Sequence, residues 1–190
     1  MMNPFNKFNR WFNIAKRKYE FDHTAFALST CDNRKPYVRM VLLKKIVKDG
    51  FIFFTNLESN KGKQFQKNNN LSMCFYWESL KKQIRISGKG ILISDRESDM
   101  YFSSRPRKSQ LGAWASKQSS VIKSRGELME RFRKFSFEFK NKDISRPPYW
   151  VGIKIKPNEF EFWEGNNFRL HKREIYKRKN NSWEKSFLSP

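Results

Sequence analysis

The sequence predicts a mainly β protein with peripheral helices, whose strands form a closed or nearly closed barrel. Seven or eight runs rich in β-branched and aromatic residues occupy most of the chain. Short connections with turn-forming residues join most of these runs, which favours antiparallel hairpins. A barrel suits such strands because closure leaves no unpaired edge. The sequence has neither a GxGxxG motif nor a Walker-type loop, so we expect no Rossmann or P-loop phosphate site.

The strands are predicted from their composition and from the turn signals between them. The segments "CDNRK" and "KDG" separate the first three runs, and paired asparagines mark turns at 166–167 and 180–181. The predicted strands cover residues 24–30, 37–46, 51–56, 71–78, 83–93, 151–165, 166–178 and 182–190.

Five helices are predicted, and most of them begin at a recognisable N-cap. The caps are Asn3 followed by Pro4, Ser59, the capping box of Ser94 with Glu97, and the similar pair Ser124 with Glu127. The predicted helices cover residues 4–18, 59–69, 94–104, 109–116 and 124–140. The first carries an apolar stripe at helical spacing, which we expect to pack on the domain and not on a membrane.

Length and charge limit the possible functions. A chain of 190 residues suits one domain, 1–190, better than two. Its 40 Lys and Arg against 18 acidic residues give a net charge of +22, which favours anionic partners such as nucleic acid, membrane surfaces or phosphorylated small molecules. Lys, Asn, Phe and Ile are enriched together, however, as compositional drift would produce, and the basic residues are scattered. We therefore expect most of the excess charge to be solvated surface.

The two cysteines, Cys31 and Cys74, cannot form a disulfide framework, and we expect both to be buried thiols in strands. With two histidines at unrelated spacings they make no recognisable metal site, so no metal is expected. The N-terminal residues lack the apolar core of a signal peptide, and no apolar run approaches the roughly 20 residues that span a bilayer. These features predict a cytoplasmic protein.

The segment "FRLHKR" places Arg169, His171 and Arg173 at alternate positions. If the segment is a strand, these three side chains lie on one face. Like charges at such short range are unfavourable unless an anion lies between them. The pattern therefore predicts an anionic ligand. Lys61, near the start of the helix predicted at 59–69, indicates a second anion site because a helix N-terminus offers free N–H groups.

Several segments together closely resemble the pyridoxine/pyridoxamine 5′-phosphate oxidase family, and their order and spacing match it over nearly the whole chain. The matching segments are "RMVLLK", "FFTNLESNKGKQ", "QIRISGKG", "YFSSRPRKSQLGAWASKQSS", "PPYWVGIKI", "EFWEG" and "FRLHKR". The resemblance implies an FMN-binding split β-barrel that works as a homodimer, with two FMN sites at the subunit interface. It also implies that the C-terminal strands, about 149–190, complete the active site.

The resemblance further implies a set of site residues. The FMN contacts would be Arg39, Met40, Val41, Leu42, Leu43, Lys44, Phe54, Thr55, Lys61, Gln83, Gln118, Ser119, Trp163 and Arg173. The substrate contacts would be Lys44, Tyr101, Arg105, Ser109, Arg169, Leu170 and His171. Arg169 and His171 would be catalytic. The implied reaction is oxidation of pyridoxamine or pyridoxine 5′-phosphate to pyridoxal 5′-phosphate, with O2 as acceptor and H2O2 as product, and with NH3 released from the amine.

One departure and two alternatives stand beside this interpretation. The family often has Arg followed by Lys where this chain has Asn60 and Lys61, so one cation near the cofactor phosphate is replaced by a neutral amide. The same fold could instead serve another split-barrel flavin reductase. A basic nucleic-acid-binding module is the alternative from a different class, supported by the net charge of +22 and the abundant aromatic residues. Dispersed cations and the absence of a known binding motif speak against a nucleic-acid or membrane partner.

Overall fold

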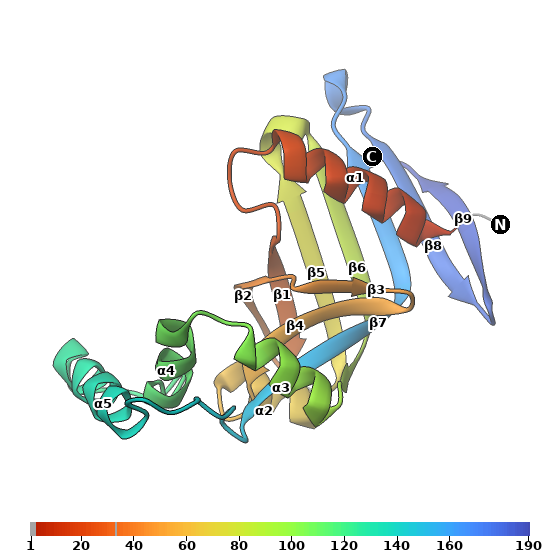
Figure 1. Cartoon of the computed structure of the whole chain (residues 1–190). Coiled ribbons are helices and arrows are strands. Elements are labelled where there is room, and N and C mark those ends of the chain that lie inside the picture. The colour runs from red at the N-terminus through yellow and green to blue at the C-terminus, as the bar shows by residue number, and fades with distance from the viewer. Residues whose placement is uncertain (1–2, 33) are drawn as a thin grey trace.

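The computed structural model describes residues 3–32 and 34–190, and in these residues it is built from one nine-stranded antiparallel sheet with helices around it (Figure 1). The helices are α1 (Pro4–Lys18), α2 (Asn60–Lys67), α3 (Asp95–Ser103), α4 (Arg107–Ala115) and α5 (Arg125–Glu138). The strands are β1 (Ala25–Cys31), β2 (Pro36–Leu42), β3 (Lys45–Val47), β4 (Gly50–Asn56), β5 (Asn70–Trp77), β6 (Lys82–Leu92), β7 (Trp150–Glu164), β8 (Lys172–Lys179) and β9 (Ser182–Leu188). Two 3-10 turns, η1 (Glu78–Leu80) and η2 (Asn167–Arg169), complete the elements.

The sheet curls into a barrel that is open along one edge. Its strand order is β2-β1-β5-β6-β7-β4-β3, with β8 and β9 continuing from β7, and every pair is antiparallel. The two ends of this order, β2 and β3, do not pair with each other in the described sheet, although only Leu43 and Lys44 separate them along the chain. The mainly β, nearly closed barrel expected from the sequence is confirmed.

Strand β7 is the longest element of the barrel and pairs with three neighbours. Residues 150–155 of β7 pair with β4, residues 153–164 with β6, and residues 159–164 with β8. The register between β6 and β7 shifts between Ser87 and Gly88, where a β-bulge bends the sheet. A Cβ at Gly88 would lie 2.2 Å from the carbonyl oxygen of Lys156, so only glycine permits this close approach of the two backbones.

The main core lies inside the barrel, and α1 covers one of its open ends (Figure 1). The apolar stripe of α1 is buried there, as the sequence predicted: Phe8 is fully buried, and its ring centroid lies 4.6 Å from that of Phe51 in β4. Helix α1 begins with the predicted cap, in which the side chain of Asn3 accepts a hydrogen bond from the backbone N–H of Phe5.

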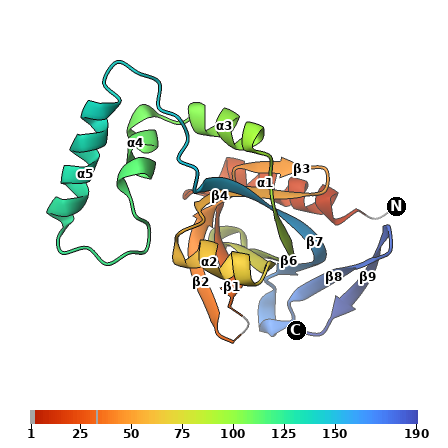
Figure 2. The same cartoon turned by 90° about the horizontal axis from the view of Figure 1, so that it is seen from below.

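A second, smaller core joins α3, α4 and α5 to the start of β7, and Figure 2 shows these helices together at one side of the barrel. Phe102, Leu111, Ile144 and Trp150 form its buried centre. Arg146 fixes the connector before β7 to α3 because its guanidinium pairs with Asp95 at 2.7 Å and with Asp99 at 2.6 Å. The helices are therefore held at the N-terminal end of β7.

The caps of α2 and α3 and the last hairpin match the sequence expectations, whereas the capping box expected at α5 does not form. Ser59 and Ser94 cap α2 and α3, and Ser94 with Glu97 forms the full capping box. At α5 the Ser124 side chain accepts from the N–H of Glu127, but the Glu127 carboxylate bonds to the N–H of Lys123 and not to that of Ser124. Strands β8 and β9 turn through residues 180 and 181, as predicted.

Three expectations differ from the structure. The run 37–46 is not one strand, because the chain leaves the sheet at Leu43 and Lys44 and begins β3 at Lys45. The run 166–178 is a strand only from Lys172. The cysteines are free but half-buried and not fully buried, and burial raises the pKa of the Cys74 thiol. Among the described residues, no helix has both the length and the apolar character that a membrane crossing requires.

Glu174 connects α1 to the last two strands through ion pairs. Its carboxylate lies 2.7 Å from Lys7 of α1 and 3.0 Å from Lys185 of β9, and it accepts a hydrogen bond from the Tyr176 hydroxyl at 3.2 Å. Burial of Glu174 alone would raise its pKa, but the hydrogen bonds from Lys7 and Lys185 outweigh it and lower the pKa to about 2.

We predict that Glu174→Gln lowers the free energy of unfolding at neutral pH by about 2–4 kcal/mol, because it leaves the half-buried Lys7 without its carboxylate partner. Since the pKa of Glu174 is below its ordinary value of 4.5, its contribution is present above pH 4.5 and is lost as the pH falls towards 2. The variant should therefore lose less stability on acidification. Urea denaturation from pH 7 to 3 measures both effects. Glu184→Gln is the matched control, since Glu184 lies on the same hairpin but is exposed, and equal curves for the two variants would contradict the prediction.

Candidate active site

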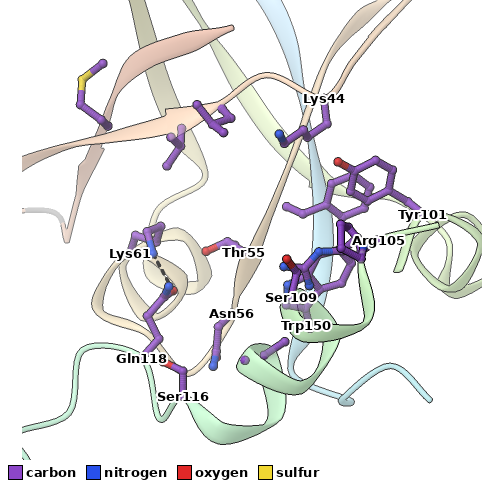
Figure 3. A pocket seen from close by; sticks show the side chains of 17 residues that line it. Lys44, Thr55, Asn56, Lys61, Tyr101, Arg105, Ser109, Ser116, Gln118 and Trp150 are labelled. Carbon is purple, nitrogen blue, oxygen red and sulfur yellow. Dashed lines mark hydrogen bonds between the residues drawn. The ribbon is translucent and has the colours of Figure 1, made fainter. Parts of the chain in front are cut away.

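A cavity of about 630 Å³ lies at the open edge of the barrel, between the β2–β3 crossing, the end of β4 and helices α3 and α4 (Figure 3). Its lining brings together eleven of the residues expected at the site: Met40, Val41, Leu42, Lys44, Phe54, Thr55, Lys61, Tyr101, Arg105, Ser109 and Gln118. Among the described residues, no Asp or Glu lines this cavity. A cleft that contains cations without carboxylates favours an anionic ligand.

One end of the cavity is formed by Lys61, in the first turn of α2, and by Gln118, in the loop after α4. The Lys61 ammonium donates to the Gln118 side-chain oxygen at 2.7 Å (Figure 3). Burial, followed by the nearby positive charge of Arg39, lowers the pKa of Lys61 to about 8. An anion bound beside Lys61 would stabilise the charged ammonium and so offset both effects on its pKa.

The other end of the cavity is formed by Lys44, Tyr101, Arg105 and Ser109, which Figure 3 shows gathered on the side opposite Lys61. The Arg105 guanidinium lies 4.8 Å from the ring centroid of Trp150, close enough for a cation–π interaction. Its Nη1 atom is buried and has no hydrogen-bond partner in the described part of the chain, and burial lowers the pKa of Arg105. A buried donor without an acceptor is costly, so this end is suited to an anion that accepts hydrogen bonds.

Three parallel aromatic rings form the wall behind Arg105. Phe54 of β4 stacks on Tyr101 of α3 with ring centroids 4.1 Å apart, and on Trp150 of β7 at 4.8 Å. Between the two ends, the hydroxyl oxygen of Thr55 is buried and without a partner among the described residues. The cavity therefore has apolar ring surfaces, two cationic ends and an unsatisfied hydroxyl. These features fit FMN, which has a flat ring system and a phosphate, together with a second phosphorylated ring.

A second group of expected site residues lies on the β6–β7–β8 part of the sheet. Trp163 is paired with Gln83 on one side and with Arg173 on the other. The His171 ring lies 4.7 Å from the Trp163 ring, and its Nδ1 atom accepts a hydrogen bond from the N–H of Asn166. Arg169 and Leu170 are exposed beside them.

The expectation that Arg169, His171 and Arg173 share one strand face is wrong. Arg169 belongs to the turn η2, His171 precedes β8, and only Arg173 lies in a strand. The turn forms because Phe168 and Arg169 both have positive φ angles, 57° and 61°, which a strand cannot contain. No alternation pattern in the sequence indicates such a backbone.

The charge of Arg173 is compensated within the chain. Its Nε and Nη2 atoms both lie 2.9 Å from the buried carboxylate of Glu161, and its Nη1 atom donates to the carbonyl oxygen of Ser189. For Arg173, the anion predicted from the alternating cations is therefore a carboxylate of this chain. Glu161 also pairs with Arg85 at 2.9 Å, so Arg173 is fixed in place and its charge is partly offset.

The two groups of site residues cannot meet within one chain. Trp150, in the cavity, and Trp163, in the second group, lie at opposite ends of β7. At about 3.3 Å per residue, the path along a strand of this length is on the order of 40 Å. Figure 1 shows α3 and α4 near one end of the molecule and the turn before β8 near the other.

Some expected residues lie outside the cavity, and some cavity residues were not expected. Leu43 points into the barrel core, and Ser119 faces a neighbouring pocket. Arg39 is bound to Gln64 of α2, close enough to Lys61 for its charge to lower the pKa of that lysine. The additional lining residues are Asn56, Pro106, Gly112, Ala113, Ser116 and Trp150. Trp150 could have been suspected from its position directly after a Pro-rich connector, but nothing in the sequence indicates that it faces Arg105.

Solved structures assign the fold to the split-barrel class. The chain superimposes on an FMN binding protein from Nostoc punctiforme, related to pyridoxamine 5′-phosphate oxidase, with a TM-score of 0.78 at 18% identity over the whole of both chains. It superimposes on PhzG from Burkholderia lata, solved with tetrahydrophenazine-1-carboxylic acid, with a TM-score of 0.93 at 28% identity, covering 99% of this chain and 93% of that one.

Sequence comparisons define the family more narrowly. Residues 15–163 match the model of the pyridoxamine 5′-phosphate oxidase family, and residues 150–190 match that of the pyridoxine 5′-phosphate oxidase C-terminal dimerisation region. The pyridoxine/pyridoxamine 5′-phosphate oxidase of Zymomonas mobilis is 44% identical over 98% of both chains. That of Pelagibacter ubique is 44% identical over all of this chain and 92% of its own. The chain belongs to the pyridoxamine 5′-phosphate oxidase family.

We predict that binding of FMN, the phosphorylated ligand implied by the resemblance, weakens as the pH rises above about 8, the pKa of Lys61. The ammonium attracts the phosphate, and its neutral form above that pKa does not, so the dissociation constant should rise by up to about tenfold per pH unit. Quenching of flavin fluorescence between pH 6.5 and 9.5 measures this dependence. Lys61→Met should bind more weakly with a flat profile, and an identical profile in that variant would refute the role of Lys61.

Proposed function

We propose that this chain oxidises pyridoxamine 5′-phosphate or pyridoxine 5′-phosphate to pyridoxal 5′-phosphate, with FMN as cofactor and O2 as the final electron acceptor. The observation that carries the proposal is a single cleft with two cationic ends and no carboxylate in its lining, in a chain of this family. Two phosphorylated ring molecules need such a pair of ends. A cleft for one flavin alone would need only one.

The residues at the Lys61 end would hold the cofactor. Lys61 and Gln118 would bind its phosphate, and Thr55 would use its unsatisfied hydroxyl towards the same ligand. The redox chemistry would be supplied by FMN: two electrons would leave the C4′ carbon of the substrate and reduce O2 to H2O2. With pyridoxine phosphate the products are pyridoxal phosphate and H2O2, and with the amine one water is consumed and NH3 is released.

The residues at the Arg105 end would hold the substrate phosphate. Arg105 offers its unpaired Nη1 donor, Tyr101 and Ser109 offer hydroxyls, and Lys44 adds a flexible cation. Because the guanidinium of Arg105 packs against the rings of both Trp150 and Phe102, this anchor is held in place before the substrate arrives. Fixing the phosphate places the reacting carbon at a constant distance from the cofactor, which is the main contribution of the chain to the rate.

We propose that the second group of residues acts in the cleft of a partner subunit. Gln83, Trp163 and Arg173 would contact the flavin from that side, while Arg169, Leu170 and His171 would cover the substrate. Separation of the two groups along β7 supports this arrangement, and the match of residues 150–190 to a dimerisation region supports a homodimer. In this proposal residues 1–190 form one domain whose C-terminal strands, about 149–190, complete the active site of the other copy.

We further propose that the enzyme works in the cytoplasm without a nucleic-acid or membrane partner. The cavity holds Lys44, Lys61 and Arg105, and aromatic side chains and helices form its walls. Such a cleft suits a small ligand better than an extended polyanion.

A direct test of the function begins with the colour of the purified protein. We expect a yellow protein with a flavin absorption band, and stoichiometric H2O2 when pyridoxamine 5′-phosphate is added in air. NH3 should appear with this substrate and not with pyridoxine 5′-phosphate. A colourless protein that remains inactive after incubation with FMN would refute the proposal.

Mixed dimers test whether the site is shared between subunits. Arg105→Ala and Arg169→Ala should each be nearly inactive as homodimers, and Arg169→Ala should keep its flavin. When the two variants are co-expressed and associate at random, about half of the dimers carry one variant of each kind. Each such dimer has one site with both arginines, so about a quarter of the wild-type activity should return. No recovery in dimers proven to be mixed would show that each site is built from one chain.

A further inference from the structure

Arg39 of β2 is held by three neutral oxygen atoms. Its Nη1 atom donates to the hydroxyl of Thr30 at 2.6 Å and to the carbonyl oxygen of Leu28 at 3.2 Å, and its Nη2 atom donates to the side-chain oxygen of Gln64 at 3.0 Å. Thr30 also donates to the same Gln64 oxygen at 2.6 Å. In the described chain no carboxylate forms an ion pair with Arg39, so its charge is oriented but not neutralised.

Gln64 and Thr30 are buried polar side chains that form hydrogen bonds with Arg39 and with each other. Thr30 is 2% exposed and Gln64 is 8% exposed. Burying an amide and a hydroxyl costs free energy that apolar side chains at the same positions would not cost. Gln64 lies in α2, three residues after Lys61, so its amide connects the helix that carries Lys61 to the strand that carries Arg39. The positive charge of Arg39 contributes to the lowered pKa of Lys61, so the two cations are close enough to repel each other.

Other arginines in the chain are held differently. Arg173 is bound by the carboxylate of Glu161, and Arg146 by those of Asp95 and Asp99. Asp95 and Asp99 fix Arg146 and offset its charge, while Glu161 is shared by Arg173 and Arg85 and offsets part of the charge of each. Gln64 is close to an uncharged equivalent of such a carboxylate, because it offers the same acceptor oxygen without the negative charge. A glutamate would hold Arg39 more strongly, so the amide suits a position where the charge must remain available.

We propose that Gln64, together with Thr30, is a positioning residue that holds Arg39 beside Lys61 and leaves its charge uncompensated for the phosphate of the cofactor. This inference rests on the proposed function. Arg39 would contact the phosphate, and Gln64 would act through Arg39 without touching the ligand.

The test compares the binding of FMN with that of riboflavin, which has the same ring system and no phosphate. We expect Gln64→Glu to fold normally, because its carboxylate can accept the same hydrogen bonds from Arg39 and Thr30. It should raise the dissociation constant of FMN by about 10- to 100-fold, since the phosphate meets a neutralised Arg39, while that of riboflavin changes by less than about threefold. Fluorescence quenching gives both constants without any assay of activity.

Gln66→Glu is the matched control, because Gln66 lies on the same helix but is exposed, so the variant adds the same charge away from Arg39. It should leave the ratio of the two dissociation constants nearly unchanged. Thr30→Val, which removes one acceptor of Arg39, should lower FMN affinity by about three- to tenfold and leave riboflavin binding unchanged. It provides an independent measurement if thermal unfolding shows that Gln64→Glu is destabilised.

The outcomes separate this inference from the proposed function. If the wild-type protein does not bind FMN, the proposed function fails and this inference fails with it. If the wild-type protein binds FMN in preference to riboflavin, and neither folded Gln64→Glu nor Thr30→Val changes that preference, the role of Gln64 alone is overturned.

Discussion

Partly buried positive charge, in a cavity whose described lining holds no carboxylate, is the constraint on which the site depends. Lys61 and Arg105 are desolvated in one cavity, and no acidic side chain lines it. Such an arrangement is unfavourable in a folded protein by itself, because each charge loses water and gains no partner. The surrounding structure nevertheless holds it, through the aromatic stack at Arg105 and the amide at Lys61. A fold retains this kind of local cost where a ligand removes it, so the same residues that weaken the empty protein define what it binds.

Strand β7 determines how the site is divided. It begins at Trp150, against the helices that hold Arg105, and it ends beside Arg173 and the turn before β8. Its pairing with three other strands fixes these two ends rigidly at a distance that no side chain can bridge. A chain with this topology can assemble both groups of residues around one ligand only through a second copy. In the proposed arrangement, dimerisation would therefore be required for the chemistry because of the length of one strand.

The sequence predicted the features that depend on local interactions. The caps of α1, α2 and α3 and the hairpin between β8 and β9 are encoded within a few residues, and the structure confirms them. It did not predict the break at Leu43, where an apolar run leaves one strand and begins another because the barrel opens there. Nor did alternation reveal the positive φ angles at Phe168 and Arg169, since neither residue favours that conformation. Trp150 was not predicted as a site residue because its place in the cavity depends on contacts with Phe54 and Arg105, which are distant in the sequence.

Composition alone could not distinguish the functional cations from the rest of a chain with a net charge of +22. The groups that hold the functional cations distinguish them from the other basic residues. A guanidinium bound by carboxylates of its own, such as Arg146 on Asp95 and Asp99, contributes shape and hydrogen bonds but little net charge to a ligand. A guanidinium held by neutral oxygens, such as Arg39, keeps its full attraction for an anion. A guanidinium with an unpaired donor, such as Arg105, can in addition donate a hydrogen bond to that anion. The type of group that holds each arginine is therefore better evidence of its role than the arginine itself, and it can be assessed only where the chain is folded.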